Sequence, residues 1–180
     1  METDISKIKK ISKQKEKENW EFRSFLKNCD VTDEKIDSIV HRLYRDIVSE
    51  IDCQKCANCC IEMVPTLDNE DIDRFSKGSG IPVAEFKSKY LIKNHESNDY
   101  TFDKMPCPFL KNNSCSCYAY RPKDCVAYPH LHKNEFTSRL INVIVNCSIC
   151  PIVFNVFEGL KNEILDYDQE NEDFSMSRMV

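Results

Sequence analysis

Four cysteines stand close together as a Cys-x-x-Cys-x-x-Cys-Cys run, at Cys53, Cys56, Cys59 and Cys60. Two thiolates separated by two residues can bind one metal ion without straining the backbone, and three in succession can surround a metal–sulfur core. The adjacent thiols of Cys59 and Cys60 diverge in a helix or a strand, so one should bind metal while its neighbour serves another metal, a second position or the core. The run therefore predicts soft-metal chemistry at residues 53–60.

Three usable thiolates from one segment cannot complete a tetrahedral site or a cubane cluster. We therefore expect further ligands from distant cysteines, drawn from Cys107, Cys115, Cys125, Cys147 and Cys150. The spacing does not separate Zn²⁺ from a [4Fe–4S] cluster, because both take soft thiolates. One site with reserve thiols and two four-thiolate sites both stay open.

The composition favours metal ligands over disulfides. The eleven cysteines among 180 residues are an odd number, which leaves a disulfide framework one sulfur short. No apolar run approaches the ~18 residues that span a bilayer, and the start, Met1-Glu2-Thr3-Asp4, lacks the basic-then-apolar order of a secretory signal. We expect a cytoplasmic protein without membrane contact, whose cysteines stay reduced.

Two further features exclude other function classes. The only glycines are Gly78, Gly80 and Gly159, so neither a phosphate loop nor a dinucleotide fingerprint can form. The formal net charge of −5 is concentrated in the acidic residues 163–180, and Glu16 and Glu18 dilute the lysines near the N-terminus. This charge pattern predicts solvated helix faces and no nucleic-acid partner.

The elements that must position the thiols are mostly helical. Apolar spacing and capping residues predict helices over Ile5–Leu26, Thr32–Ile51, Asp68–Ser76, Pro82–Ile92 and Pro151–Asp166, and short extended segments over Ile61–Leu67 and Leu140–Val145. Prolines at 106, 108 and 122 forbid a long helix over residues 100–128, where four cysteines lie. We therefore expect the cysteines of residues 100–128 to lie in loops that form part of the metal site.

The predicted fold class is mainly α, with irregular cysteine-rich loops and a few short strands, in a small single domain organised around a metal site. Residues 1–30 are predicted to be an N-terminal helical arm and residues 31–165 a cysteine-cluster metal-binding domain. Residues 166–180 are predicted to be an acidic disordered tail.

The order of motifs over residues 53–165 resembles the YkgJ-like cysteine-cluster family, described as zinc- or iron-chelating proteins. The resemblance rests on the run at 53–60, Pro106-Cys107-Pro108-Phe109-Leu110, Cys115, Tyr118-x-x-Arg121-Pro122-x-x-Cys125-x-x-Tyr128-Pro129, and Cys150-Pro151. It implies metal ligands at Cys53, Cys56, Cys59, Cys60, Cys107, Cys115, Cys125 and Cys150. Cys29, Cys117 and Cys147 fall outside the pattern, and we interpret Cys117 as a packed thiol.

The resemblance extends to flagellin lysine N-methylases, whose methyl transfer is thought to involve an iron–sulfur centre. This chain is shorter and has no recognisable S-adenosylmethionine motif, so the resemblance implies the metal more directly than a reaction, and enzymatic activity stays open. We favour an iron–sulfur cluster, [4Fe–4S], with a redox or methyl-transfer-like role. The alternatives are a structural zinc-binding protein without catalytic activity and a thiol-rich metal store or chaperone. A protein substrate or redox partner would follow, and the oligomeric state stays open.

Arg121 and the histidines near it each have two interpretations. Arg121 could donate hydrogen bonds to bound sulfur or form a surface salt bridge; because Pro122 and Cys125 fix its loop, we favour a role in binding the cofactor. His130 and His132 could be imidazole ligands, but a solvated loop is the preferred interpretation.

Overall fold

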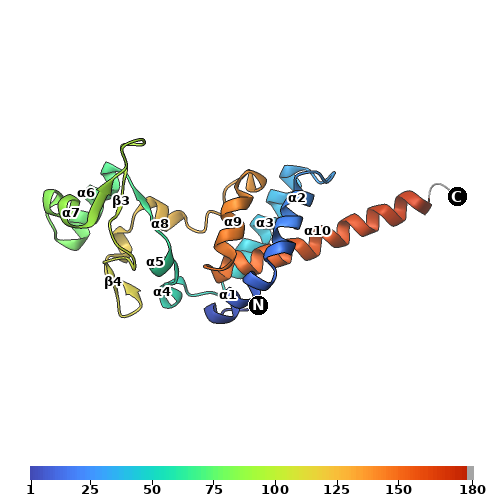
Figure 1. The fold of residues 1–180 in the computed structure, drawn as a ribbon, viewed down its shortest axis with the longest axis horizontal. Coiled ribbons are helices and arrows are strands. Elements are labelled where there is room, and N and C mark those ends of the chain that lie inside the picture. The colour runs from blue at the N-terminus through green and yellow to red at the C-terminus, as the bar shows by residue number, and fades with distance from the viewer. Residues whose placement is uncertain (178–180) are drawn as a thin grey trace. The chain divides into compact units, whose positions relative to one another are not determined.

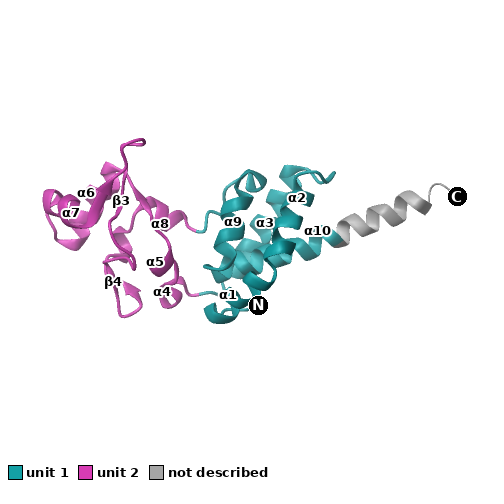
Figure 2. Cartoon of the chain, in the orientation of Figure 1, with its two compact units in different colours: residues 1–51, 129–180 teal, residues 52–128 magenta. Residues whose placement is uncertain are grey.

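The chain forms two compact units (Figure 2). The helical unit consists of residues 1–51 and 129–180, and the cysteine unit of residues 52–128. This computed structural model describes the backbone of residues 1–177 and the side chains of residues 1–165, so the tail predicted over residues 166–180 lies outside the fully described part. The mainly α fold with a few short strands is confirmed. The predicted segments 1–30, 31–165 and 166–180 stay a prediction.

The helical unit packs its helices around a long C-terminal helix (Figure 1). Its elements are α1 (Ile5–Gln14), α2 (Glu16–Leu26), α3 (Asp33–Val48), the 3-10 helix η2 (Phe136–Arg139), α9 (Leu140–Cys147) and α10 (Pro151–Ser177). Helix α10 packs against α1, α3 and α9. The core between them buries Ile36, Val40 and Phe157 completely. Every helix in the described part of the chain is too short or too polar to cross a membrane.

The predicted helix boundaries hold best where a cap is visible in the sequence. Thr32 accepts a hydrogen bond from the Lys35 backbone N–H and caps α3, as its residue type and position predict. The helix expected over Ile5–Leu26 is instead two helices, because Lys15 between α1 and α2 has φ −92° and ψ 9°.

The strand predicted over Leu140–Val145 is wrong, because these residues belong to α9. Leu140, Val143 and Ile144 are buried, at the three- and four-residue intervals of one helix face. Ile141 and Val145, in contrast, are exposed. Packing of this apolar face against neighbouring helices outweighs the β propensity of the branched side chains.

The cysteine unit combines short helices with two small antiparallel sheets (Figure 1). Its helices are α4 (Cys53–Cys56), α5 (Cys59–Glu62), α6 (Asn69–Ser79), α7 (Val83–Tyr90), the 3-10 helix η1 (Tyr118–Tyr120) and α8 (Lys123–Ala127). Strands β1 (Thr66–Leu67), β3 (Tyr100–Phe102) and β2 (Leu91–Lys93) form one sheet in that order, and β4 (Leu110–Lys111) pairs with β5 (Ser114–Cys115) in the other. The extended segment expected over Ile61–Leu67 is therefore restricted to its C-terminal end.

An aromatic cluster forms the core of the cysteine unit. Its buried members are Leu67, Ile72, Phe75, Phe86, Phe102, Phe109 and Cys117, with Cys107 and Cys115 packed against it. The ring of Phe75 lies 4.6 Å from that of Phe109 and 5.2 Å from that of Phe86, centroid to centroid. Cys117 is 6% exposed in this cluster, so its interpretation as a packed thiol is confirmed.

Gly78 allows α6 to approach the 3-10 helix η1 closely. A Cβ atom at this position would lie 2.2 Å from Cγ and 2.6 Å from Cβ of Tyr120, and the Cβ is attached to the backbone and cannot easily move away. We expect Gly78→Ala to lower the free energy of unfolding by about 1–3 kcal/mol, because the contact must be forced apart. Urea denaturation measures this loss. Lys77→Ala, at an exposed position of the same helix, is the control and should stay within about 0.5 kcal/mol of wild type.

Candidate metal centre

The Cys-x-x-Cys-x-x-Cys-Cys run folds as two single helical turns separated by a kink. Asp52 caps α4 by accepting hydrogen bonds from the backbone N–H groups of Gln54 and Lys55. Ala57, which is buried, has φ 47°, a left-handed conformation that is uncommon for a residue with a Cβ atom. This kink separates α4, with Cys53 and Cys56, from α5, which begins at Cys59 and Cys60.

Backbone hydrogen bonds join this run to the next two cysteines. The N–H of Cys107 donates to the carbonyl oxygen of Cys60 over 2.8 Å, although the two residues are far apart in sequence. The N–H of Leu110 donates to the carbonyl of Cys107, and Leu110 pairs with Cys115 across the β4–β5 hairpin. Three of the predicted ligands are therefore fixed relative to one another by the main chain.

The turn of this hairpin also holds α4. Asn112 and Asn113 have φ values of 50° and 58°, as two-residue hairpin turns require and as asparagine tolerates. The side-chain amide of Asn113 donates to the carbonyl oxygen of Lys55 in α4. The hairpin that contains Cys115 is thus tied to the helix that contains Cys53 and Cys56.

Electrostatic coupling places the Cys125 thiol in the same neighbourhood. Burial raises the pKa of Cys125 to about 12, and the nearby thiols of Cys60 and Cys107 add to the increase. Burial likewise raises the pKa of Cys107 to about 11, with Cys60 and Cys115 contributing. In contrast, a hydrogen bond from Cys59 lowers the pKa of Cys60 to about 7. Four predicted ligands, Cys60, Cys107, Cys115 and Cys125, therefore influence one another.

Cys53 and Cys56, which lie at the two ends of α4, are neighbouring thiols that influence each other. Burial is the main cause that raises the pKa of Cys53, followed by the thiol of Cys56. Cys53 is nevertheless exposed at the surface of the unit. Among the described residues, no three or more His, Cys, Asp or Glu side chains are gathered tightly enough to hold a metal ion, so the complete ligand set stays a prediction.

Arg121 places its positive charge near this group of thiols. Its guanidinium lowers the pKa values of Cys53 and Cys115, although burial raises both overall. It donates a hydrogen bond over 2.8 Å to the carbonyl oxygen of Tyr118 and lies 3.8 Å from the centroid of that tyrosine ring. The guanidinium is thus held in place, and its binding to a cofactor stays a prediction.

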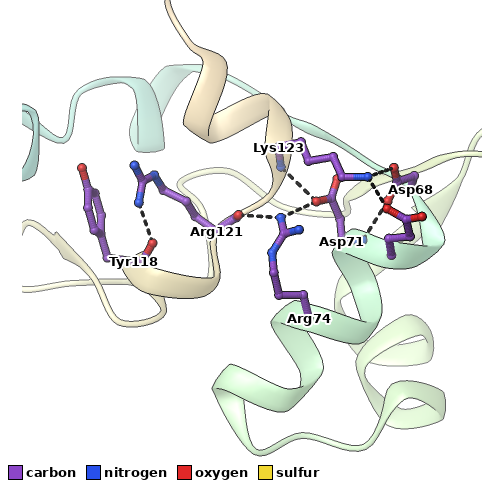
Figure 3. A network of polar contacts seen from close by, with 7 residues as sticks. Asp68, Asp71, Arg74, Tyr118, Arg121 and Lys123 are labelled. Atoms are coloured by element: carbon purple, nitrogen blue, oxygen red, sulfur yellow. Dashed lines mark hydrogen bonds and ion pairs between the residues drawn. The ribbon is translucent and has the colours of Figure 1, made fainter.

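The segment that leads to Cys125 is fastened to α6 by a polar network that the sequence analysis missed (Figure 3). Asp71 accepts hydrogen bonds from the Arg74 side chain and from the backbone N–H of Lys123, the latter over 2.9 Å. Arg74 also donates to the carbonyl oxygen of Arg121 over 3.0 Å. The only sequence signal was the Asp68-x-x-Asp71 pattern, which predicts a helix start and not a long-range contact.

The eighth predicted ligand lies in the other unit. Cys150 directly precedes α10 in the helical unit and is 7% exposed, while Cys147 ends α9 and is also buried. His130 and His132 lie in the loop before η2, and His132 is exposed, with its ring 6.3 Å from that of Tyr44. The cysteine unit itself therefore contains seven of the eight predicted ligands, and Cys150 stays a prediction as a ligand.

A family model described as "CxxCxxCC: Putative zinc- or iron-chelating domain" matches residues 52–150, more than half of the chain. The chain belongs to this CxxCxxCC family. The match includes the four-cysteine run, Cys107, Cys115, Cys125 and Cys150, so the predicted resemblance is confirmed. Neither the curated proteins nor the solved structures gave a match.

Membership of the CxxCxxCC family supports metal binding by cysteines, with zinc or iron as the metal. The thiol-rich donor set fits either ion, because both accept soft sulfur ligands. The backbone hydrogen bond from Cys107 to Cys60 connects the Cys-x-x-Cys-x-x-Cys-Cys run, after which the family is named, to the later cysteines.

Proposed function

We propose that this CxxCxxCC domain binds an iron–sulfur cluster, most simply [4Fe–4S], through cysteine thiolates. The hydrogen bond from the Cys107 N–H to the Cys60 carbonyl is the observation that supports it best, because it brings the run and a remote cysteine together. The candidate ligands are Cys53, Cys56, Cys59, Cys60, Cys107, Cys115, Cys125 and Cys150.

The chemistry of these donors supports such a cluster. All the candidate ligands are cysteines, and cysteine thiolates are the usual ligands of iron–sulfur clusters. Four thiolates bring a large negative charge, which the guanidinium of Arg121 near Cys53 and Cys115 would partly offset. A bound cluster would supply one-electron transfer, with a potential that depends on charge and hydrogen bonds around its sulfurs.

We further propose a redox or protein-modifying role, related to methyl transfer, in the reducing cytoplasm. The exposure of Cys53 supports an encounter with another protein, either a substrate or a redox partner, because this thiol lies at the surface of the unit. A purely structural zinc site is the second candidate, since the description of the family names zinc as well as iron.

Anaerobically purified protein is expected to contain iron and acid-labile sulfide and to show a brown visible charge-transfer band. The reason is that the candidate ligands are all thiols, the donors that iron–sulfur clusters use. Elemental analysis with a sulfide assay is the measurement, made on the full chain before and after exposure to air. Stoichiometric zinc without sulfide or colour would replace the cluster by a structural zinc site.

A further inference from the structure

Helix α8 needs support from outside, because it cannot hold Cys125 in position by itself. It spans only Lys123–Ala127, far shorter than a helix that is stable alone in water. Its N-cap residue is Pro122, which makes no side-chain capping bond. The first N–H groups of any helix lack partners within that helix, so another part of the chain must satisfy them.

Asp71 of α6 supplies this missing cap from a distance. Its carboxylate accepts the hydrogen bond from the Lys123 N–H, the first N–H of α8, over 2.9 Å. The side chain of Asp71 is only 3% exposed and is paired with Arg74. A buried carboxylate bonded to a cation and to a backbone N–H makes strong, charge-assisted contacts. Asp71 therefore fixes where α8 begins.

Arg74 fastens the other side of the same turn. It donates to the carbonyl oxygen of Arg121, so the Asp71–Arg74 pair holds the chain on both sides of Pro122 (Figure 3). One side of this turn leads to the Arg121 guanidinium over the Tyr118 ring, and the other leads through one helical turn to Cys125. Electrostatic coupling of Arg121 to Cys115, and of Cys125 to Cys60 and Cys107, is consistent with both groups lying near the other candidate ligands.

We propose that Asp71, with Arg74, is a positioning residue for the metal centre, which acts by setting the place of Cys125 and Arg121. The inference rests on the proposed cysteine-ligated metal centre and is independent of whether that centre holds zinc or iron. Residues that orient metal ligands typically change metal affinity by 10–100-fold when they are replaced. We expect the replacement of Asp71 to lower metal affinity in the same way, although Asp71 is not itself a metal ligand.

The test is a titration of metal-free full-length protein with Co²⁺ under anaerobic conditions, which reports thiolate ligation through its charge-transfer band. Asp71→Ala is expected to weaken Co²⁺ binding by at least about tenfold and to reduce the band per bound ion. Lys123→Ala is the matched control, since it removes the ion pairs of Lys123 with Asp68 and Glu70 but keeps the backbone N–H that Asp71 accepts. This control should bind Co²⁺ like wild type.

A double-mutant cycle separates positioning from general destabilisation. If Asp71 acts by placing Cys125 and Arg121, Asp71→Ala should weaken Co²⁺ binding less in Cys125→Ser than in the wild-type background, because only the part exerted through Arg121 is left, whereas a merely structural effect would add in full. Where Asp71→Ala loses its helical circular dichroism, Asp71→Asn, which keeps one acceptor for the Lys123 N–H, takes its place with a smaller expected loss.

The possible failures are distinguishable. Wild-type protein that takes up no Co²⁺ would overturn the metal centre and the inference with it. Normal Co²⁺ binding by wild type together with unchanged binding in Asp71→Ala would overturn the inference alone. Additive losses in the cycle, or no effect of Cys125→Ser, would also overturn it.

Discussion

Cys107→Ser is expected to lose most of the bound metal and to lower the melting temperature of the metal-loaded protein by about 10 °C or more. The binding free energy of a structural metal is free energy of folding, and each kcal/mol lost shifts the melting temperature of a chain of this size by about 2–4 °C. Cys107 is chosen because its backbone N–H donates a hydrogen bond to the carbonyl oxygen of Cys60, which links it to the four-cysteine run. Metal analysis and calorimetry, each with and without a chelator, measure the two effects.

Cys117→Ser is the control that separates a ligand from a packed thiol. The Cys117 side chain is 6% exposed among phenylalanine rings, so its replacement should cost about 1–3 kcal/mol for burying a hydroxyl group. Its metal content should stay at the wild-type value. In metal-free protein, Cys107→Ser should melt close to wild type. Full metal occupancy in Cys107→Ser would remove Cys107 from the ligand set.

The parts of the site that could be predicted are those with local spacing. The residue types and spacing of the run at Cys53–Cys60 predict that it binds a soft metal, and the family match over residues 52–150 supports that prediction. The local conformation of this run could not be predicted. A regular helical pattern would continue through residues 53–60, but the left-handed conformation of Ala57 divides them into two turns. Cys117 could be recognised as a packed thiol because it lies outside the ligand pattern of the family, and the structure places it in the aromatic cluster.

The parts that sequence reasoning missed depend on contacts between distant residues. Asp71 and Lys123 are separated by 52 positions, and only the folded chain brings the carboxylate to that N–H. The same cause explains the wrong strand at residues 140–145, since packing of one helical face outweighed local β propensity. The candidate metal ligands could therefore be predicted from the sequence, whereas the residues that position them could not.

Phe75→Ala is expected to lower the free energy of unfolding of the cysteine unit by about 3–5 kcal/mol, the usual cost of removing a buried phenylalanine ring. Phe75 is 1% exposed and contacts the rings of Phe86, Phe102 and Phe109. No neighbour can fill the space of a whole ring without moving another ring of the cluster. Urea denaturation followed by far-ultraviolet circular dichroism measures the loss.

The same substitution should also weaken metal binding, because the aromatic cluster supports the loop that contains Cys107. Phe109 stands two residues after Cys107, and the Ser116 N–H and hydroxyl both bond to its carbonyl, which ties the loop to the segment after Cys115. Phe75→Leu keeps most of the volume and should cost about 1–2 kcal/mol, with a correspondingly smaller change in affinity. If metal affinity stayed at the wild-type value while stability fell by the full amount, the core would stabilise the unit without positioning its thiols. A parallel decline of both quantities across Phe75→Leu and Phe75→Ala would show that packing around Phe109 sets the geometry that the cysteines need.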